Sequence, residues 1–328
     1  MPYFDTNFYS EIMNRWLLSV VVILAVSVCA LYVFIPGTLE VSKVIPVKGN
    51  VDAANRVLAD TTRWSAWWPG GGGQGSNPDG HPVLTYGNTK YVVMQRFLRS
   101  AAVEIDADGL VLPSMLVAAP HRGIDSTFLT WSFRRQTSSN PLERLKDYWA
   151  ARRIHAEMGD ILAGLRNYLE TDSLLYGLSI RKERVKDTLV AETTRKLIAY
   201  PSTTDIYSVV QVLENFVKGY GGSVIGYPMV NVTPDSGAYT VRVAVPVDRQ
   251  TFDKGDIVFH NLPGRALFLD ADVHGGEWSV REGLRQMGYY LSDRQRKLMA
   301  IPFTSLITDR RVQPDTSKWV TRIYFPFF

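Results

Sequence analysis

The sequence AYTVRVAVP at residues 238–246 returns in similar form as WVTRIYFP at residues 319–326. Each stretch has the residue alternation of a β-strand and ends in proline. An apolar run precedes each of them, IGYPMVNV at 225–232 and MAIPFTSL at 299–306. A helical pattern and a further strand come before each pair. The C-terminal half is therefore predicted to contain one strand–helix–strand–strand unit twice.

Several motifs of this half resemble the gyrase-inhibitor-like effector-binding domain, a family that is also fused to multidrug-sensing transcription activators. They are the Gly226-Tyr227-Pro228 turn, His274-Gly275-Gly276, Ile301-Pro302-Phe303 and Ile323-Tyr324-Phe325-Pro326. The resemblance implies an effector-binding domain at residues 178–328. In that family two pseudo-symmetric halves form a groove for small, often cationic or aromatic molecules, and some members hydrolyse strained small molecules.

One position departs from the family pattern. Arg322 stands where the family often has a glutamate that pairs with cationic ligands, and aligning Pro246 with Pro326 puts Arg242 at the equivalent point of the first repeat. Strand alternation leads us to expect both guanidinium groups in the groove, where they would select an anionic or acceptor-rich ligand. The alternative is that each arginine pairs with a structural carboxylate or lies on a solvated face.

Aromatic residues near the same motifs would complete a largely apolar site. Each of them could equally belong to the core. The predicted ligand-binding residues are Arg242, Arg322, Tyr324, Tyr227, Phe303 and Trp278.

The N-terminal half, residues 39–170, has a different pattern: a strand, a helix, an antiparallel meander and one long helix. The long helix starts at Asn140-Pro141, an N-cap followed by proline. An apolar stripe is predicted along it, made of Leu142, Leu145, Trp149, Ile161, Leu162, Leu165 and Leu169.

This order of elements resembles the START-like (polyketide-cyclase-like) helix-grip family. The phrase Ala59-Asp60-Thr61-Thr62-Arg63-Trp64-Ser65-Ala66-Trp67 matches a helix end of that family. The resemblance implies a curved sheet that wraps the last helix and encloses an apolar cavity. Trp64, Trp67 and Trp68 would then line a cavity mouth, or else they cap a core without a cavity.

Residues 16–35, WLLSVVVILAVSVCALYVFI, contain no charged residue. A helix of this length matches the bilayer core of about 30 Å. We therefore expect a short segment at 1–15 and a single-pass anchor that places the protein at the cell membrane, on a side that stays open. A cleaved signal peptide is the alternative, although no A-x-A site follows.

Composition narrows the classes of function. The single cysteine, Cys29, excludes a disulfide framework and a thiolate zinc site. The net charge of +4 is small and scattered, and no helix-turn-helix precedes the binding module, so nucleic acid is not an expected partner. Asp270, Asp272 and His274 share one strand face, which suits either a metal or solvent. We favour solvent and predict no cofactor, metal or catalytic residue.

The sequence thus predicts a mixed α+β protein with a transmembrane helix, a helix-grip domain and a duplicated effector-binding domain. The expected function is binding of a small molecule, anionic or aromatic, by a membrane-anchored sensor, carrier or sequestering protein. A membrane-tethered hydrolase that uses the same groove is the alternative. A scaffold with vestigial pockets that binds a protein partner is the third possibility.

Overall fold

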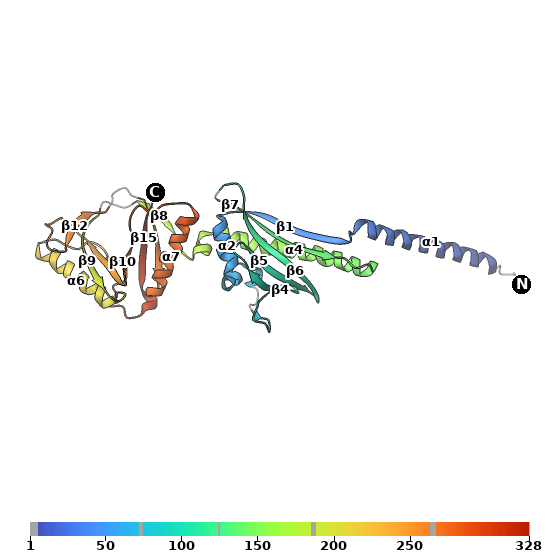
Figure 1. The fold of residues 1–328 in the computed structure, drawn as a ribbon, viewed down its shortest axis with the longest axis horizontal. Helices are drawn as coiled ribbons and strands as arrows, with labels where there is room; N and C mark the ends of the chain where they lie inside the picture. Colours follow the sequence, from blue (N-terminus) through green and yellow to red (C-terminus); the bar gives the residue numbers. More distant parts are fainter. Residues whose placement is uncertain (1–5, 72–74, 124, 185–187, 263–266, 328) are drawn as a thin grey trace. The chain divides into compact units, whose positions relative to one another are not determined.

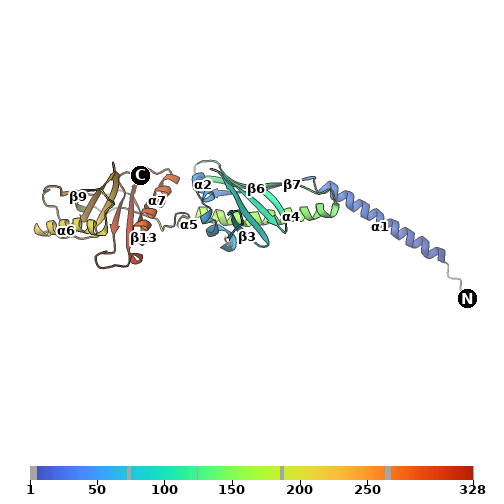
Figure 2. The same cartoon turned by 60° about the horizontal axis from the view of Figure 1, so that its bottom comes forward.

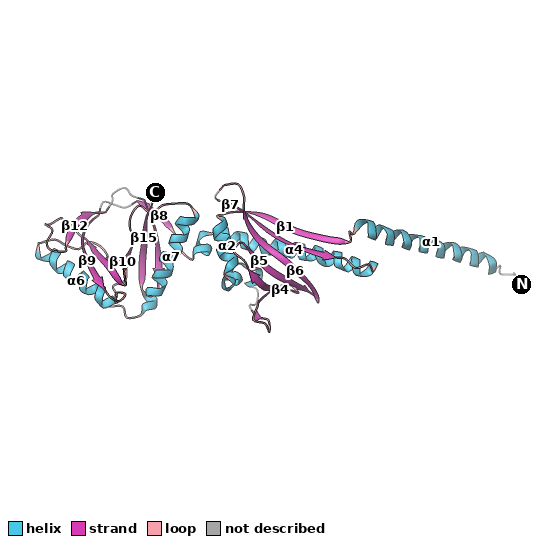
Figure 3. Ribbon diagram, viewed as in Figure 1, coloured by secondary structure: helices cyan, strands magenta, loops and turns pink. Residues whose placement is uncertain are grey.

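The computed structural model describes residues 6–71, 75–123, 125–184, 188–262 and 267–327, with side chains from residue 16 onward. The chain divides into two compact units, Met1–Glu170 and Thr171–Phe328. We call them the N-terminal unit and the C-terminal unit. Each combines helices with one curled antiparallel sheet, as Figures 1 and 3 show, so the predicted α+β class is confirmed.

The first helix, α1 (Thr6–Phe34), ends just before Pro36, a residue that cannot continue a helix. Its segment Trp16–Phe34 is long and apolar enough to cross a membrane, and the same length and composition also fit a signal sequence. Trp16, Leu18 and Phe34 are exposed to at least two thirds of their surface. α1 is therefore a candidate for a membrane span.

The sheet of the N-terminal unit has seven strands in the order β1-β7-β6-β5-β4-β3-β2, and every paired strand is antiparallel to its neighbour. It curves around the long helix α4 (Pro141–Glu170), which both views of the ribbon show (Figures 1 and 2). The predicted meander and terminal helix are both present. The strands are β1 (Thr38–Lys48), β2 (Gly75–Ser76), β3 (Pro82–Tyr86), β4 (Thr89–Arg96), β5 (Ser100–Ala107), β6 (Leu110–Pro120) and β7 (Ser126–Gln136).

Short helices lie between β1 and β2 in the chain, and local sequence signals account for several boundaries. They are α2 (Val51–Ala59), η1 (Thr61–Arg63), α3 (Trp64–Trp67) and η2 (Pro69–Gly71). Asn50 caps α2 by accepting a hydrogen bond from the Asp52 backbone N–H at 2.7 Å. Between β5 and β6 the chain turns at Asp108 and Gly109, both with positive φ, which is the tight hairpin turn that Asp-Gly favours.

The predicted apolar stripe on α4 is wrong in its first turns. Ile161, Leu162, Leu165 and Leu169 are buried, but Leu142 is 71% exposed and Trp149 60%. Polar residues occupy the buried side there instead. Arg144 donates two hydrogen bonds to the Ile35 carbonyl, and the Asp147 carboxylate accepts one from the Ser138 backbone N–H at 3.1 Å.

The sheet of the C-terminal unit has eight strands in the order β12-β9-β11-β10-β14-β15-β13-β8. Its strands are β8 (Arg181–Arg184), β9 (Leu189–Leu197), β10 (Met229–Asp235), β11 (Ala238–Pro246), β12 (Val258–Asn261), β13 (Leu267–His274), β14 (Phe303–Leu306) and β15 (Val320–Phe327). Its helices are α5 (Asp172–Tyr176), α6 (Thr203–Gly219), α7 (Glu277–Asp293) and η3 (Thr316–Lys318).

The predicted duplication is confirmed at the level of element order. The first repeat runs β9-α6-β10-β11 and the second runs β13-α7-β14-β15. Six strands of the sheet follow the order β9-β11-β10-β14-β15-β13. The first three come from the first repeat, and the equivalent strands of the second repeat follow in reverse order. The β10–β14 pair therefore lies at the centre of a pseudo-two-fold arrangement.

Each repeat has its own core between its helix and one face of the sheet. Val241, Val243 and Val245 of β11 join the cluster beneath α6. Ile323 and Phe325 of β15 join the cluster beneath α7. The apolar strand faces therefore pack on the helices, and by strand alternation Arg242 and Arg322 lie on the other face.

Candidate ligand cavity

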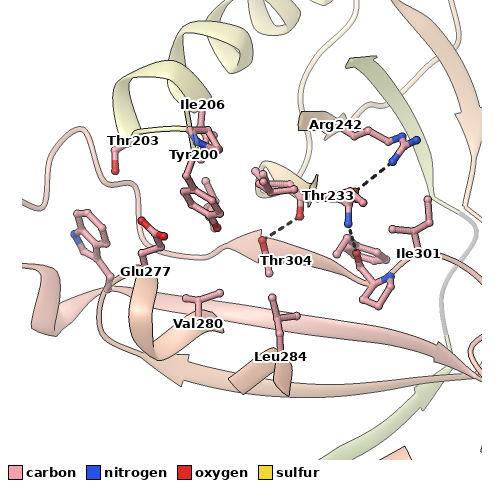
Figure 4. A pocket seen from close by; sticks show the side chains of 18 of the residues that line it. Tyr200, Thr203, Ile206, Thr233, Arg242, Glu277, Val280, Leu284, Ile301 and Thr304 are labelled. Carbon is pink, nitrogen blue, oxygen red and sulfur yellow. Dashed lines mark hydrogen bonds between the residues drawn. The ribbon is translucent and has the colours of Figure 1, made fainter. Parts of the chain in front are cut away.

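A cavity of about 1010 Å³ lies within the C-terminal unit and takes its walls from both repeats. The first repeat contributes the start of α6, with Thr203 and Ile206, and Tyr200 just before it. The second repeat contributes Val280 and Leu284 of α7. Figure 4 shows the Val280 and Leu284 side chains on the opposite side of the cavity from Tyr200 and Ile206.

The cavity lies where the two repeats meet with little pairing. β10 and β14 share only two residue pairs, Met229 with Ser305 and Val230 with Thr304. Beyond them, Asn231 donates a side-chain hydrogen bond to the Pro302 carbonyl at 2.8 Å. Because the ladder stops after two pairs, residues from both faces of the sheet, such as Val232 and Arg242, reach the same cavity.

A smaller cavity of about 390 Å³ adjoins the sheet face that carries Arg242. Its lining includes Glu192, His260 and Phe268. Arg242 and Phe303 line both cavities. Of the predicted ligand-binding residues, these two are therefore brought together.

Arg322 is held by carboxylates instead. Its Nε donates to Asp272 Oδ1 at 2.6 Å and its Nη2 to Asp272 Oδ2 at 3.1 Å. This ion pair holds the pKa of Asp272 below the ordinary aspartate value. Arg322 lines neither of the two cavities. For Arg322, therefore, the structure matches the alternative stated in the sequence analysis: this arginine pairs with a structural carboxylate.

The strand register explains why the two arginines differ. On β13, Asp272 lies directly across from Arg322, whereas on β9 the residue across from Arg242 is Thr194. Arg242 therefore has no carboxylate opposite it, and its Nη1 donates to Asn231 Oδ1 at 3.3 Å.

The remaining predicted aromatic residues lie outside the two cavities. Tyr324 stacks on Phe303 with ring centroids 4.9 Å apart. Tyr227 and Trp278 are 53% and 77% exposed. None of these three lines either cavity, although Tyr324 supports the ring of Phe303, which does.

Arg310 lines the large cavity and was not among the predicted residues. It lies in the loop between β14 and β15, where strand alternation gives no information about direction. Its guanidinium lies 4.6 Å from the ring centroid of Trp319, and its Nη2 donates to Thr321 Oγ1 at 2.7 Å. Burial lowers the pKa of Arg310.

Glu277 is the one carboxylate among the described residues that line the large cavity. Its Oε1 lies 3.5 Å from Arg281 Nη1, and both side chains are largely exposed. Burial raises the pKa of nearby Tyr200, and the charge of Glu277 raises it further. Figure 4 shows Glu277 and Tyr200 at the same end of the cavity.

On the strand face of Asp270, Asp272 and His274, both aspartates pair with arginines. Arg181 donates to both aspartates, with Nε 2.9 Å from Asp270 Oδ2 and Nη1 3.1 Å from Asp272 Oδ2. Within the described ranges no group of three or more potential metal ligands gathers anywhere. The two aspartates instead form an ion-pair network with Arg181 and Arg322.

In the N-terminal unit the tryptophans of the START-like phrase belong to the core. Trp64, Trp67 and Trp68 are all less than 5% exposed. Trp68 also packs edge-on against Tyr91 and Trp131, with centroids 5.2 and 6.4 Å apart. The interpretation of these residues as core, rather than as a cavity mouth, is the one that the packing supports.

No family model matches the chain, and no curated protein matches it. Among solved structures, the C-terminal domain of EcmrR has 15% identity and a TM-score of 0.40 over 46% of this chain and 98% of that one. A hydrolase from Listeria innocua has 9% identity and a TM-score of 0.34, covering 45% of this chain and 91% of that one.

A protein solved in complex with tetraphenylphosphonium has 11% identity and a TM-score of 0.29, covering 46% of this chain and 94% of that one. At these identities and scores, the likeness assigns neither a family nor an activity to this chain. None of the three supports the START-like resemblance of the N-terminal half, which stays a prediction.

Proposed function

We propose that the chain is a membrane-tethered protein that binds a small molecule in the large cavity of its C-terminal unit. The observation that carries this proposal is the cavity of about 1010 Å³ with walls from both repeats. Small-molecule sites are concave, mostly apolar and about 300–1,000 Å³ in volume, with a few polar groups that fix orientation. Ile206, Val280 and Leu284 supply apolar walls, and Arg242 and Arg310 supply polar groups.

The apolar helix α1 supplies the tether in this proposal. Its exposed segment Trp16–Phe34 would lie in the bilayer as a single pass. Sensing, carriage and sequestration of the ligand at the cell membrane all fit such an arrangement.

Binding is favoured over hydrolysis by the polar groups that line the cavity. Glu277 is the one carboxylate among the described lining residues, and Arg281 lies within ion-pair distance of it. A general acid or base must reach the proton that it transfers at hydrogen-bond distance. Glu277 is instead largely exposed and paired with Arg281.

Native mass spectrometry tests the proposal. The full chain, extracted from the membrane in which it is expressed, should carry a small-molecule adduct in the wild type. Leu284→Trp, which places a bulky ring in the cavity, should reduce the adduct, and Leu284→Ala, which leaves the cavity open, should retain it. Thermal unfolding of both variants controls for folding. Absence of any adduct, or equal adducts in all three proteins, would contradict the proposal.

A further inference from the structure

We infer that the ligand of the large cavity is an amphipathic anion, an apolar body with a carboxylate-type acid group that Arg310 binds. This inference rests on the proposed function, because it assigns a ligand class to the same cavity. Three observations carry it: the fixed position of Arg310, its missing counter-charge, and the pairing of the one carboxylate in the lining.

The guanidinium of Arg310 is fixed before any ligand arrives. The hydroxyl of Tyr207, on α6, accepts a hydrogen bond from the Arg310 backbone N–H at 3.0 Å. The side chain lies over the Trp319 ring, and Trp319 is held in turn by donating its Nε1–H to the Gln313 carbonyl at 2.7 Å. A guanidinium fixed in this way offers its remaining N–H groups with little loss of side-chain entropy on binding.

Arg310 has no counter-charge among the described residues. Its Nε is buried without a hydrogen-bond partner, and no carboxylate of the described chain lies within ion-pair distance of it. The neighbouring Arg311 pairs with Asp309 at 2.7 Å, and Arg322 pairs with Asp272 at 2.6 Å. A partly desolvated cation without an anionic partner is unfavourable, and a bound anion relieves that penalty.

A cationic ligand would meet less favourable surroundings in the same cavity. Two arginines, Arg242 and Arg310, line it against one glutamate. That glutamate, Glu277, already has Arg281 at 3.5 Å. An acid group is therefore the charged group that the lining accepts, while Val280, Leu284 and Ile301 contact the apolar body.

A pair of matched probes tests the inference. The anion 2-naphthoate and its neutral analogue 2-naphthamide have nearly the same shape. Both are titrated calorimetrically into the full chain in phosphatidylcholine nanodiscs, with empty nanodiscs as the reference. The wild type should bind the anion about tenfold or more tightly than the amide, since a hydrogen bond to a charged group contributes that much. Arg310→Gln should remove this preference and leave amide binding unchanged.

Three further variants separate the possible outcomes. Arg311→Gln, which removes an adjacent arginine that is already paired, should keep the preference. Arg310→Lys, which retains the charge, should keep most of it. Equal binding of the two probes by the wild type, or a preference that survives Arg310→Gln, overturns the assignment to Arg310. Binding of neither probe, or binding that Leu284→Trp leaves unchanged, counts against the cavity as a ligand site altogether.

Discussion

Arg242 and Arg322 occupy equivalent positions in the two repeats, yet they meet different surroundings. The difference comes from one residue on the neighbouring strand, Thr194 in the first repeat and Asp272 in the second. A duplicated fold can thus neutralise one arginine and leave its counterpart facing a cavity. The charge of the site is set by cross-strand partners rather than by the repeated motif itself.

The Asp272–Arg322 pair should make stability depend on pH. Because Arg322 lowers the pKa of Asp272 in the folded protein, the ionised carboxylate stabilises the fold above the unfolded pKa of about 3.9. That contribution is lost as the pH falls through the folded pKa. In urea unfolding, Asp272→Asn should therefore be less stable than the wild type at pH 7, with a difference that shrinks below about pH 4.

Arg322→Gln is the matched control for this pair, because it removes the largest cause of the lowered Asp272 pKa and should reduce the same pH dependence. A difference between wild type and Asp272→Asn that stays constant from pH 7 to pH 3 would show that the ion pair does not shift the titration.

Two glycines of α7 should respond to alanine in opposite directions. A Cβ at Gly283 would lie 2.7 Å from Val273 Cγ2, whereas at Gly288 no atom lies within 4 Å. Gly283→Ala should destabilise the C-terminal unit by about 1–3 kcal/mol through overpacking. Gly288→Ala should stabilise it by about 0.5–1 kcal/mol through helix propensity. Urea unfolding measures both, and effects of the same sign would contradict the packing of α7 on β13.

Elements differ in how far their sequences determine them. The Asn140-Pro141 start of α4 and the Asp-Gly hairpin could be predicted because capping and turn geometry depend on a few adjacent residues. The exposure of Leu142 and Trp149 could not be predicted in this way. It follows from the burial of Arg144 against the end of α1. Periodicity marks an apolar face of a helix but does not show which face meets the rest of the protein.

The contact between α1 and α4 leads to a prediction about Arg144. This side chain is 8% exposed, lies 4.7 Å from the Tyr32 ring centroid and donates from Nε to the Ile35 carbonyl at 3.0 Å. Arg144→Ala leaves that carbonyl without its partner and should cost about 1–3 kcal/mol. Hydrogen exchange should become faster in the first turns of α4.

Arg152→Ala is the control, because Arg152 is an exposed arginine on the same helix. Its effect on unfolding should stay within about 0.5 kcal/mol. Equal exchange rates in Arg144→Ala and Arg152→Ala would show that the Arg144 contact does not hold the start of α4.

At the scale of the whole molecule, the internal repeat of the sequence predicts the two strand–helix–strand–strand repeats of the C-terminal unit. Each repeat keeps the apolar–polar alternation of its strands and the apolar pattern of its helix. The cavity between them depends on how few residues join β10 to β14 and on where the β14–β15 loop places Arg310. Neither is encoded by a local pattern. The candidate site was therefore predictable in its general location, while its charged residues were only partly so.

The most direct test of the central claim is an electron-density map of the full chain crystallised with 2-naphthoate. The account predicts density for the probe inside the large cavity, with its ring against Leu284 and Ile206 and its carboxylate at Arg310. Probe density outside that cavity, or a cavity filled by protein side chains from both repeats, would contradict it.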